Sequence, residues 1–351
     1  MKRFLPKAAM TAAAAVFVAA AAIAFSACGT AARAEGQAYF SEPVIIGEGG
    51  EWPLDGVLTM PREARARNPV PAVVLVHGSG PADMDSNVFG NRPFFDIASH
   101  LSANGVAVIR YNKRTYTHAM RMIETLGASL TVWEETIEDA ILAAELLRAD
   151  PRINPNRVYM LGLSMGGMLA PNIHESGGNF AGLILMAGTP RLLGEIIIEQ
   201  FETGIELAME AGPEKDAQMA QLYLLEELLL AIPYMSAAEA KATQVMGSSA
   251  YYFLDFASRS FTDYIRKTSV PILVMQGERD FQVRADKDFV LMKELLEGRD
   301  NVTFRLYENL NHLFMQTTAT NFIEHAEEIT QTPGRVDARV LRDIVEWISA
   351  R

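Results

Sequence analysis

Residues 158–169 read Val-Tyr-Met-Leu-Gly-Leu-Ser-Met-Gly-Gly-Met-Leu and contain the motif G-x-S-x-G with Ser164 at its centre. The apolar run 158–161 predicts a buried strand, and a helix is predicted from Met165 onward. In such a strand–turn–helix unit the glycines let neighbouring backbone pass close by, and the serine hydroxyl stands clear of the sheet as a nucleophile. The bare motif arises by chance in about one protein in ten of this length, so the strand and helix around it carry the assignment.

A nucleophilic serine requires a base and an acid that orients the base. In this architecture they follow the serine in the order acid, then histidine, at the C-terminal ends of later strands. Asp280 and His312 each follow a predicted strand. The loops at the C-terminal edge of an α/β sheet form its active site, so Ser164, Asp280 and His312 are predicted to meet there. Glu278 is the alternative acid.

The other histidines are weaker candidates for the base. His174 lies ten residues beyond Ser164 on the predicted helix, about 15 Å along the helix axis, which is too far for proton transfer. His100 is predicted within a helix, as a surface or packing residue. His118 and His325 fall in less regular stretches of sequence and stay open as alternatives, subject to hydrogen-bond reach.

The negative charge that develops on a substrate oxygen requires backbone N–H donors, and the sequence offers two. The amide of Met165 opens the predicted helix, where the helix dipole favours negative charge. A second donor is expected in His77-Gly78-Ser79-Gly80, the loop after a buried strand, because its glycines let the backbone come close. Ser79 is the predicted donor, and His77 is interpreted as a histidine packed beneath the loop by hydrogen bonds.

Strand and helix signals alternate along the body of the chain. The predicted strands are 44–46, 57–60, 72–76, 106–109, 158–161, 183–186, 271–275 and 302–306, the first two forming an antiparallel pair. The predicted helices are 93–103, 131–149, one from Met165, 285–296 and 335–348. This alternation favours an α/β fold with a mostly parallel central sheet and helices on both faces. The predicted domain is 39–351, with an inserted helical lid at about 191–260.

The predicted lid is rich in methionine and aliphatic residues. Two interpretations stay open: the lid closes an apolar pocket over Ser164, or Met209, Met219 and the band 222–230 fill the lid's own core. Separately, an acidic run at 134–139 begins a predicted helix. Acidic residues at that end complement the helix dipole, so no further role is assigned to them.

Composition restricts the class of protein. The 351 residues are 49% hydrophobic, enough for a large core. The formal net charge is −12, and the chain lacks a basic stripe of the kind that neutralises phosphates, so no nucleic-acid partner is expected. A single cysteine excludes an internal disulfide and a cysteine-rich metal site. The sequence contains no metal, nucleotide or dinucleotide motif, so no cofactor is expected.

The N-terminus has the pattern of an export signal. Basic residues precede an uncharged apolar run at 8–27, and the only cysteine, Cys28, follows Phe-Ser-Ala. This resembles a bacterial lipobox, which predicts a signal peptide at 1–27, a lipid on Cys28, a tether at 28–38 and attachment to a membrane of the cell envelope outside the cytoplasm. Cleavage by an ordinary signal peptidase at the segment 32–34, Ala-Arg-Ala, followed by secretion, is a second interpretation. The third is that the apolar run is retained as an uncleaved membrane anchor.

These motifs resemble the α/β-hydrolase superfamily, and within it bacterial serine carboxylesterases of the EstD type. The matching segments are 77–81, 110–115, 134–140, 162–171, 276–280 and 311–314, which together span nearly all of residues 40–350. The resemblance implies the α/β-hydrolase fold and ester hydrolysis by the triad of Ser164, Asp280 and His312. Two positions depart from the pattern, because Met84 stands where arginine is expected and Asn112 where aspartate is commoner. A charged pair there would support the loop at Ser79, and it is lost.

The expected reaction is hydrolysis of short- to medium-chain carboxylic esters through an acyl-enzyme on Ser164. The substrate is then a small-molecule ester, and the lipid on Cys28 provides the contact with a membrane. A thioesterase or a small-peptide hydrolase is the alternative, because a fold does not specify its substrate. A membrane-anchored binding protein without catalysis is a remote alternative, which the complete triad and both donor segments disfavour.

Overall fold

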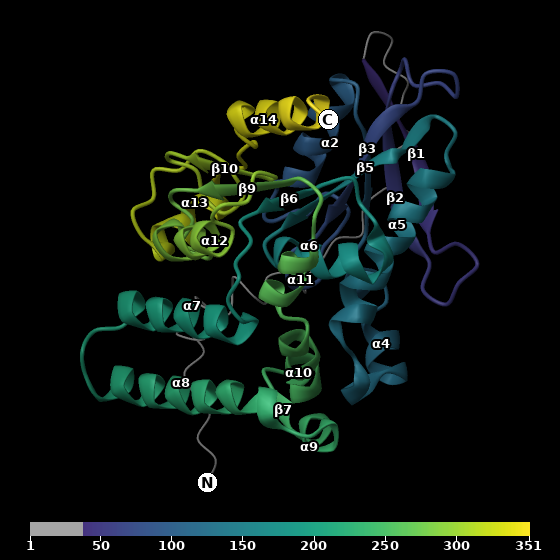
Figure 1. Cartoon of the computed structure of the whole chain (residues 1–351). Coiled ribbons are helices and arrows are strands. Elements are labelled where there is room, and N and C mark those ends of the chain that lie inside the picture. The colour runs from purple at the N-terminus through teal and green to yellow at the C-terminus, as the bar shows by residue number, and fades with distance from the viewer. Residues whose placement is uncertain (1–37) are drawn as a thin grey trace.

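The computed structural model describes residues 38–351 and is built on a central sheet (Figure 1). Cys28, the predicted signal peptide and nearly all of the predicted tether lie outside the described residues. The sheet has eight strands in the order β1-β2-β4-β3-β5-β6-β9-β10. Their bounds are β1 (Tyr39–Ile46), β2 (Leu54–Pro61), β3 (Val70–Val76), β4 (Ala107–Tyr111), β5 (Ile153–Leu163), β6 (Leu183–Met186), β9 (Ile272–Gly277) and β10 (Val302–Tyr307).

The predicted mostly parallel sheet is confirmed. β2 pairs antiparallel with β1 and β4, and all other neighbouring strands of the sheet run parallel. The central strands are buried on both faces because their sequences are almost continuously apolar. Along β3, Val73 and Leu75 join the core on one face of the sheet, and Val74 and Val76 join the core on the other.

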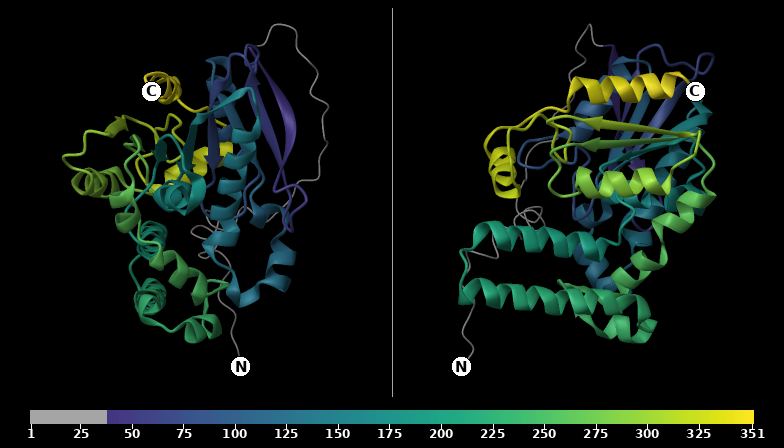
Figure 2. Two further views of the ribbon diagram at one scale, coloured as in Figure 1. Left: turned by 45° about the vertical axis from the view of Figure 1, so that its right-hand side comes forward. Right: turned by 60° about the vertical axis from the view of Figure 1, so that its left-hand side comes forward.

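Helices cover both faces of the sheet, as predicted. The helices on one face are α2 (Pro93–Ala103) and α14 (Ala338–Ser349), and those on the other include α5 (Glu138–Ala149), α6 (Met165–Ile173) and α12 (Val290–Leu295) (Figure 2). α14 docks through one apolar stripe, in which Val340, Ile344 and Trp347 are buried. Short π-helical turns adjoin these helices at η2 (Trp133–Ile137), η3 (His174–Gly178) and η5 (Ala285–Phe289).

The chain between β6 and β9 forms the inserted helical lid. Its elements are α7 (Leu193–Ala208), α8 (Pro213–Ala231), η4 (Ile232–Tyr234), α9 (Ala237–Ala242), β7 (Gln244–Val245), β8 (Ser248–Ser249), α10 (Ala250–Ser258) and α11 (Phe261–Lys267). α7 and α8 lie side by side and extend away from the sheet (Figures 1 and 2). The lid has a core of its own, with Ile198, Leu222 and Leu229 buried in it. α11 instead packs on α6, within the layer that covers the sheet.

Several short helices outside the lid are not predicted by the sequence, namely α3 (Arg114–Thr117), α4 (Ala119–Thr125), η1 (Gly127–Ser129) and α13 (Phe322–Gln331). The prediction that His325 lies in a less regular stretch is wrong, because His325 is in α13. Its start signal is present: the side chain of Asn321 accepts hydrogen bonds from the backbone N–H groups of Ile323 (3.1 Å) and Glu324 (3.0 Å). α3 and α4 are too short for apolar periodicity to reveal them.

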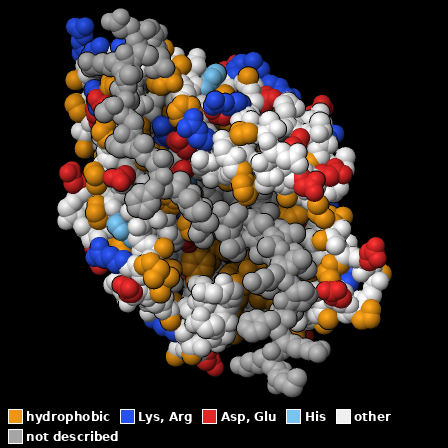
Figure 3. Space-filling view, turned by 180° about the vertical axis from the view of Figure 1, so that it is seen from behind, with side chains coloured by type: hydrophobic (Ala, Val, Ile, Leu, Met, Phe, Trp, Pro, Cys, Tyr) orange, Lys and Arg blue, Asp and Glu red, His pale blue; other side chains and the backbone are white. Residues whose placement is uncertain are grey.

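The surface of the described residues is mixed in character. On the face turned away from the viewer of Figure 1, acidic and basic side chains are scattered among hydrophobic and other side chains (Figure 3). No helix within residues 38–351 is both long enough and apolar enough to cross a bilayer.

The turn between β5 and α6 brings backbone segments very close together. Ser164 at the turn has φ 56° and ψ −120°, a region sparsely populated by residues other than glycine. A Cβ on Gly166 would lie 2.7 Å from the carbonyl oxygen of His77, and a Cβ on Gly162 would lie 2.6 Å from the nitrogen of Gly167. Only glycine fits at these two positions, which explains the glycines of the motif.

His77 supports the loop after β3 from below. The side chain is almost fully buried and packs against the rings of Phe94 and Tyr111. Its Nε2 donates a hydrogen bond to the carbonyl oxygen of Asp83 at 2.9 Å. Burial, with a smaller contribution from the positive charge of Lys113, lowers the pKa of His77 to about 3. The ring is therefore neutral at neutral pH, and the packing role predicted for His77 is confirmed.

We expect His77→Gln to make the free energy of unfolding less dependent on pH between about pH 3 and pH 6.5. An unfolded chain protonates this group near pH 6.5, whereas the folded chain does so only near pH 3, so unfolding takes up a proton between these values. The free energy of unfolding of the wild type should therefore decrease as the pH is lowered through this window, by up to about 1.4 kcal/mol per pH unit from His77. Urea titrations measure this slope, and above about pH 7 the two curves should be parallel. A constant difference at every pH would contradict the prediction.

A second prediction concerns the tight turn. Gly166→Ala should lower the free energy of unfolding by at least about 3 kcal/mol, because the added Cβ would overlap the backbone carbonyls at the end of β3. The matched control is Gly212→Ala, since a Cβ at Gly212 would meet nothing within 4 Å. Gly212 is the N-cap of α8, so a loss of about 1 kcal/mol or less is expected there. Equal losses in the two variants, measured by denaturant unfolding, would refute the argument.

Candidate active site

A cavity of about 220 Å³ contains two members of the predicted triad, Ser164 and His312. His312 follows β10, and its Nδ1 is hydrogen-bonded to Oδ2 of Asp280 at 2.7 Å. Since the Asp280 carboxylate accepts this bond, the ring proton is on Nδ1, and Nε2 is left as a proton acceptor. The structure thus brings together the three residues that the sequence singles out.

Asp280 is held rigidly in the loop after β9. Its Oδ1 accepts hydrogen bonds from the backbone N–H groups of Gln282 (2.8 Å) and Val283 (2.9 Å). Its Oδ2 accepts one from the side-chain amide of Gln276 (3.0 Å) in addition to that from His312. With both oxygens fixed, the carboxylate can orient the imidazole of His312 without itself changing position.

The alternative acid and three of the alternative bases are engaged elsewhere. Glu278 is exposed and accepts a hydrogen bond from a backbone amide of the loop before His312. His118 bonds a backbone carbonyl before β2, His174 accepts a bond from the backbone N–H of Phe180, and His100 lies in the last turn of α2. None of these three histidines lines the cavity.

His325 is the exception, because it lines the same cavity as Ser164. It is 2% exposed and packs against Phe281. Its two ring nitrogens have no hydrogen-bond partner among the residues that the structure describes. Burial lowers the pKa of His325, with Asp280 acting in the opposite direction. His325 therefore contributes a neutral ring to the wall and stands beside the Asp280–His312 pair without joining it.

The two predicted oxyanion donors lie on the same cavity. Ser79 and Met165 both line it, and Met165 is the first residue of α6. The preceding Gly78 lies against Ser164, since a Cβ built on it would be 3.2 Å from Cβ and 3.7 Å from Oγ of Ser164. The carbonyl oxygen of Gly78 accepts a hydrogen bond from Nζ of Lys113 at 2.8 Å. Sequence reasoning did not identify this lysine.

The two positions that depart from the family pattern face each other. The side-chain oxygen of Asn112 accepts a hydrogen bond from the backbone N–H of Met84 at 2.9 Å. This contact needs no charge on either side chain. An ion pair stands one residue further on, between Asp85 Oδ1 and Nε of Arg110 at 2.8 Å, with Arg92 at 3.4 Å from the other oxygen. The loop after β3 therefore keeps polar support despite the two departures.

The interpretation of the acidic run at 134–139 as a complement to the helix dipole is incomplete. Glu135 is buried and forms an ion pair with Lys113 at 2.6 Å, and Asp139 is buried against Arg114. A buried charge needs a partner because leaving water is costly. The sequence contained a signal for these pairs, since Lys113 and Arg114 follow a buried strand directly and the two acids are spaced four residues apart, on one helix face.

The wall of the cavity is mostly apolar. α6 and the lid contribute Met165, Met168, Leu193, Ile196 and Gln200, and the loop after β9 contributes Gln282 and Val283. The loop after β3 contributes Val88 and Phe89, and the chain after β10 contributes Leu313, Ala326 and Ile329. Both interpretations of the lid therefore apply. One side of α7 faces the cavity, whereas Met219 of α8 packs against the lid's own core.

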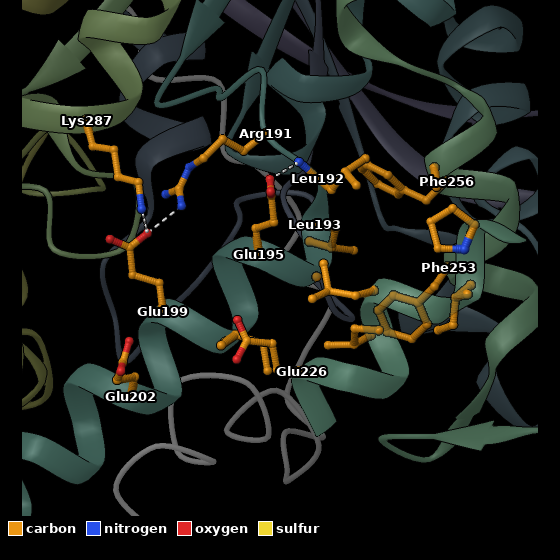
Figure 4. A pocket seen from close by; sticks show the side chains of 17 residues that line it. Arg191, Leu192, Leu193, Glu195, Glu199, Glu202, Glu226, Phe253, Phe256 and Lys287 are labelled. Atoms are coloured by element: carbon orange, nitrogen blue, oxygen red, sulfur yellow. Dashed lines mark hydrogen bonds and ion pairs between the residues drawn. The ribbon is translucent and has the colours of Figure 1, made fainter. Parts of the chain in front are cut away.

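A larger cavity of about 350 Å³ lies within the lid, between α7, α8 and α10 (Figure 4). Leu229 and Phe253 are in its wall, and Glu199 at its edge pairs with Arg191 at 2.5 Å and Lys287 at 3.2 Å. No triad residue lines this cavity, so we place the chemistry in the smaller one. Within residues 38–351, no group of three or more His, Cys, Asp or Glu side chains is arranged to hold a metal ion.

Comparison with known proteins identifies relatives over most of the chain. The profile of the alpha/beta hydrolase family matches residues 73–325. Esterase EstD from Thermotoga maritima is 34% identical to this chain over 297 residues, which are 84% of this chain and 65% of that protein. The chain thus spans less than two thirds of the length of this relative.

Solved structures share the fold. Est1E from Butyrivibrio proteoclasticus superposes with a TM-score of 0.53 at 16% identity, over 88% of this chain and 99% of that one. An esterase from Pyrobaculum calidifontis gives 0.51 at 16% identity, over 89% and 85%. The eight-stranded sheet with its inserted lid is therefore an α/β-hydrolase fold. Together with the profile match and the 34% identity to an esterase, this shows that the chain belongs to the alpha/beta hydrolase family.

Proposed function

We propose that the chain is a serine carboxylesterase acting on short- to medium-chain carboxylic esters. One observation carries the proposal: His312 is bonded through Nδ1 to Asp280 and lines the same cavity as Ser164, which stands on a strained strand-to-helix turn. A serine, a histidine and a carboxylate in these roles form the nucleophile, base and orienting acid of acyl transfer. The similarity to esterase EstD favours esters as the substrate class.

The reaction proceeds in two steps. Oγ of Ser164 attacks the ester carbonyl carbon while Nε2 of His312 takes the serine proton, and Asp280 stabilises the imidazolium that results. The N–H groups of Ser79 and Met165 donate hydrogen bonds to the carbonyl oxygen as it becomes negative. Collapse of this intermediate expels the alcohol, which receives the proton from His312. Water activated by His312 then attacks the acyl-enzyme, releases the carboxylic acid and restores Ser164.

The size and the lining of the cavity support the substrate range. Its volume of about 220 Å³ is below the roughly 300–1,000 Å³ of sites for drug-sized ligands, which favours a short or medium acyl chain over a long one. Leu193 and Ile196 of α7 and Met168 of α6 provide apolar contacts for such a chain. Burial of each methylene group is worth about 0.8 kcal/mol, so the rate constant kcat/KM should rise with chain length until the cavity is full.

For the segment before residue 38 we propose the arrangement that the sequence indicates. Residues 1–27 act as a lipoprotein signal peptide, Cys28 carries the lipid, and the tether holds the enzyme to a membrane of the cell envelope, outside the cytoplasm. Secretion after cleavage at 32–34 is the competing arrangement. The supporting observation is the lipobox-like order of residues that ends at Cys28.

Ser164→Ala should abolish ester hydrolysis and leave the fold unchanged. The variant loses the only atom that the proposal assigns to nucleophilic attack, so kcat should fall by about 10⁴-fold or more. The measurement is hydrolysis of p-nitrophenyl esters from acetate to palmitate by the full chain, with circular dichroism to verify folding. A fluorophosphonate should label the wild type and not the variant. Ester hydrolysis retained by Ser164→Ala would overturn the assignment, and a folded, inactive wild type would turn attention to thioesters and peptides.

Asp280→Asn should lower kcat by about 10³- to 10⁴-fold with little change in KM, because an amide at this position no longer selects the tautomer of His312 with its proton on Nδ1. The matched control is Glu278→Gln, a change at an exposed acid in the same loop, which should leave kcat within about twofold of the wild type. Steady-state kinetics of both variants and the wild type on one ester measure these changes in kcat and KM. Reversal of the two results would make Glu278 the orienting acid.

A further inference from the structure

Lys113 is a buried lysine that the mechanism above does not use. It follows β4, and its side chain is 2% exposed. Its ammonium group has two close partners, the carbonyl oxygen of Gly78 at 2.8 Å and Oε1 of Glu135 at 2.6 Å. Taking an ammonium and a carboxylate out of water is energetically costly for each ion. An apolar pair would fill the same space without this cost, so the position calls for an explanation other than stability.

The bond to Gly78 fixes the direction of a neighbouring N–H. The carbonyl of Gly78 and the N–H of Ser79 belong to one planar trans peptide group and point in opposite directions. Lys113 is not part of the cavity lining, whereas Gly78 and Ser79 both are. With its carbonyl bound to Lys113, this peptide directs the Ser79 N–H away from Lys113. A glycine has the backbone freedom to rotate this peptide away, and the bond to Lys113 opposes that rotation.

The same network reaches the second donor and the lid. Oε2 of Glu135 accepts a hydrogen bond from the hydroxyl of Tyr252 at 2.5 Å. Tyr252 is in α10, one of the helices of the lid. That hydroxyl also lies 3.7 Å from Sδ of Met165. Burial, followed by the negative charge of Glu135, raises the pKa of Tyr252 well above its usual value, so the group stays a hydroxyl donor.

We infer that Lys113 is a positioning residue for the oxyanion hole: its ammonium holds the Gly78–Ser79 peptide with the Ser79 N–H directed at the developing negative charge, and Glu135 and Tyr252 connect this peptide to α10 of the lid. The inference rests on the proposed function, because an oxyanion forms only if Ser164 attacks a carbonyl. It predicts that Lys113 matters for the transition state and little for binding of the ground-state ester.

A purely structural role predicts something different. If Lys113 only neutralised Glu135, removing both charges together would alter the free energy of unfolding and leave the affinity of the site for an oxyanion unchanged. The test variant is therefore the double replacement Lys113→Met with Glu135→Gln, which leaves no unpaired charge buried. The matched control is Lys215→Met in the lid, since Lys215 also pairs with a glutamate, Glu206, at 2.6 Å and lies outside the lining of the active-site cavity.

The experiment measures kcat and KM of the full chain on p-nitrophenyl butyrate, and the inhibition constant of an alkyl trifluoromethyl ketone, which adds to Ser164 and places a negative oxygen in the hole. In the double variant kcat should fall about 100-fold and ketone affinity by a similar factor, the size expected for one lost oxyanion donor, with KM within about twofold. Lys215→Met should change none of these. Tyr252→Phe, which keeps Lys113 in place, should lower kcat by a smaller factor, again at constant KM.

The outcomes separate the inference from the function on which it rests. A wild type without Ser164-dependent ester hydrolysis refutes the proposed function and the inference with it. An active wild type whose folded double variant keeps its kcat and its ketone affinity refutes the inference alone. If the double variant does not fold, Tyr252→Phe is the deciding variant. Unchanged kcat and ketone affinity in Tyr252→Phe would contradict the inferred connection of the Gly78–Ser79 peptide to α10. A parallel fall in kcat and ketone affinity at constant KM would support the inference.

Discussion

The site depends on one crossing of backbone, where the start of α6 passes over the end of β3. Gly166 lies so close to the carbonyls of Val76 and His77 that no side chain fits between them, and the turn that allows this approach holds Ser164 in a strained conformation. Such strain persists only where the surroundings fix it. They do so here, because all nine residues of α6 are buried. The crossing sets Ser164 against Gly78, and the cavity forms around that contact.

Buried charges determine geometry around this crossing more than they add stability. Lys113 with Glu135, and Arg114 with Asp139, attach the segment after β4 to the helix that begins at η2 and continues as α5. Ion pairs of this kind offer little net stabilisation compared with apolar contacts of the same volume, and they permit few alternative arrangements. At the entry to the lid, Arg191 likewise bonds the fully buried Asp288 at 2.7 Å. Charged groups thus fix both the segment after β4 and the segment that leads into α7.

Sequence patterns predicted the parts of the structure that depend on local chemistry. The apolar runs of the central strands and the glycines around Ser164 have one structural solution, and Asp280 and His312 come together because the loops after neighbouring parallel strands share one edge. The short helix α13 was missed because its signal is a single N-cap at Asn321 rather than a long periodicity. Lys113 was missed because the spacing of the acids and the position of the lysine after a buried strand do not show which groups meet. Its partners, one preceding it by 35 residues and the other following it by 22, are brought to it by the folded chain.

Helix α7 belongs to two packing units at once. α7 turns Leu193 and Ile196 toward the active-site cavity, while Ile198 joins a core that the lid shares with α8 and α10 rather than with the sheet. Leu193 also belongs, with Ile197, to the core that contains α6 and the sheet, so the cavity side of α7 rests on the same packing as the helix after Ser164. A substitution at Leu193 therefore affects both the cavity wall and the core around α6, whereas one at Ile198 affects the core of the lid. Positions in the lid's own core can therefore vary in evolution more freely than the cavity side of α7, where each change also acts on the packing around Ser164.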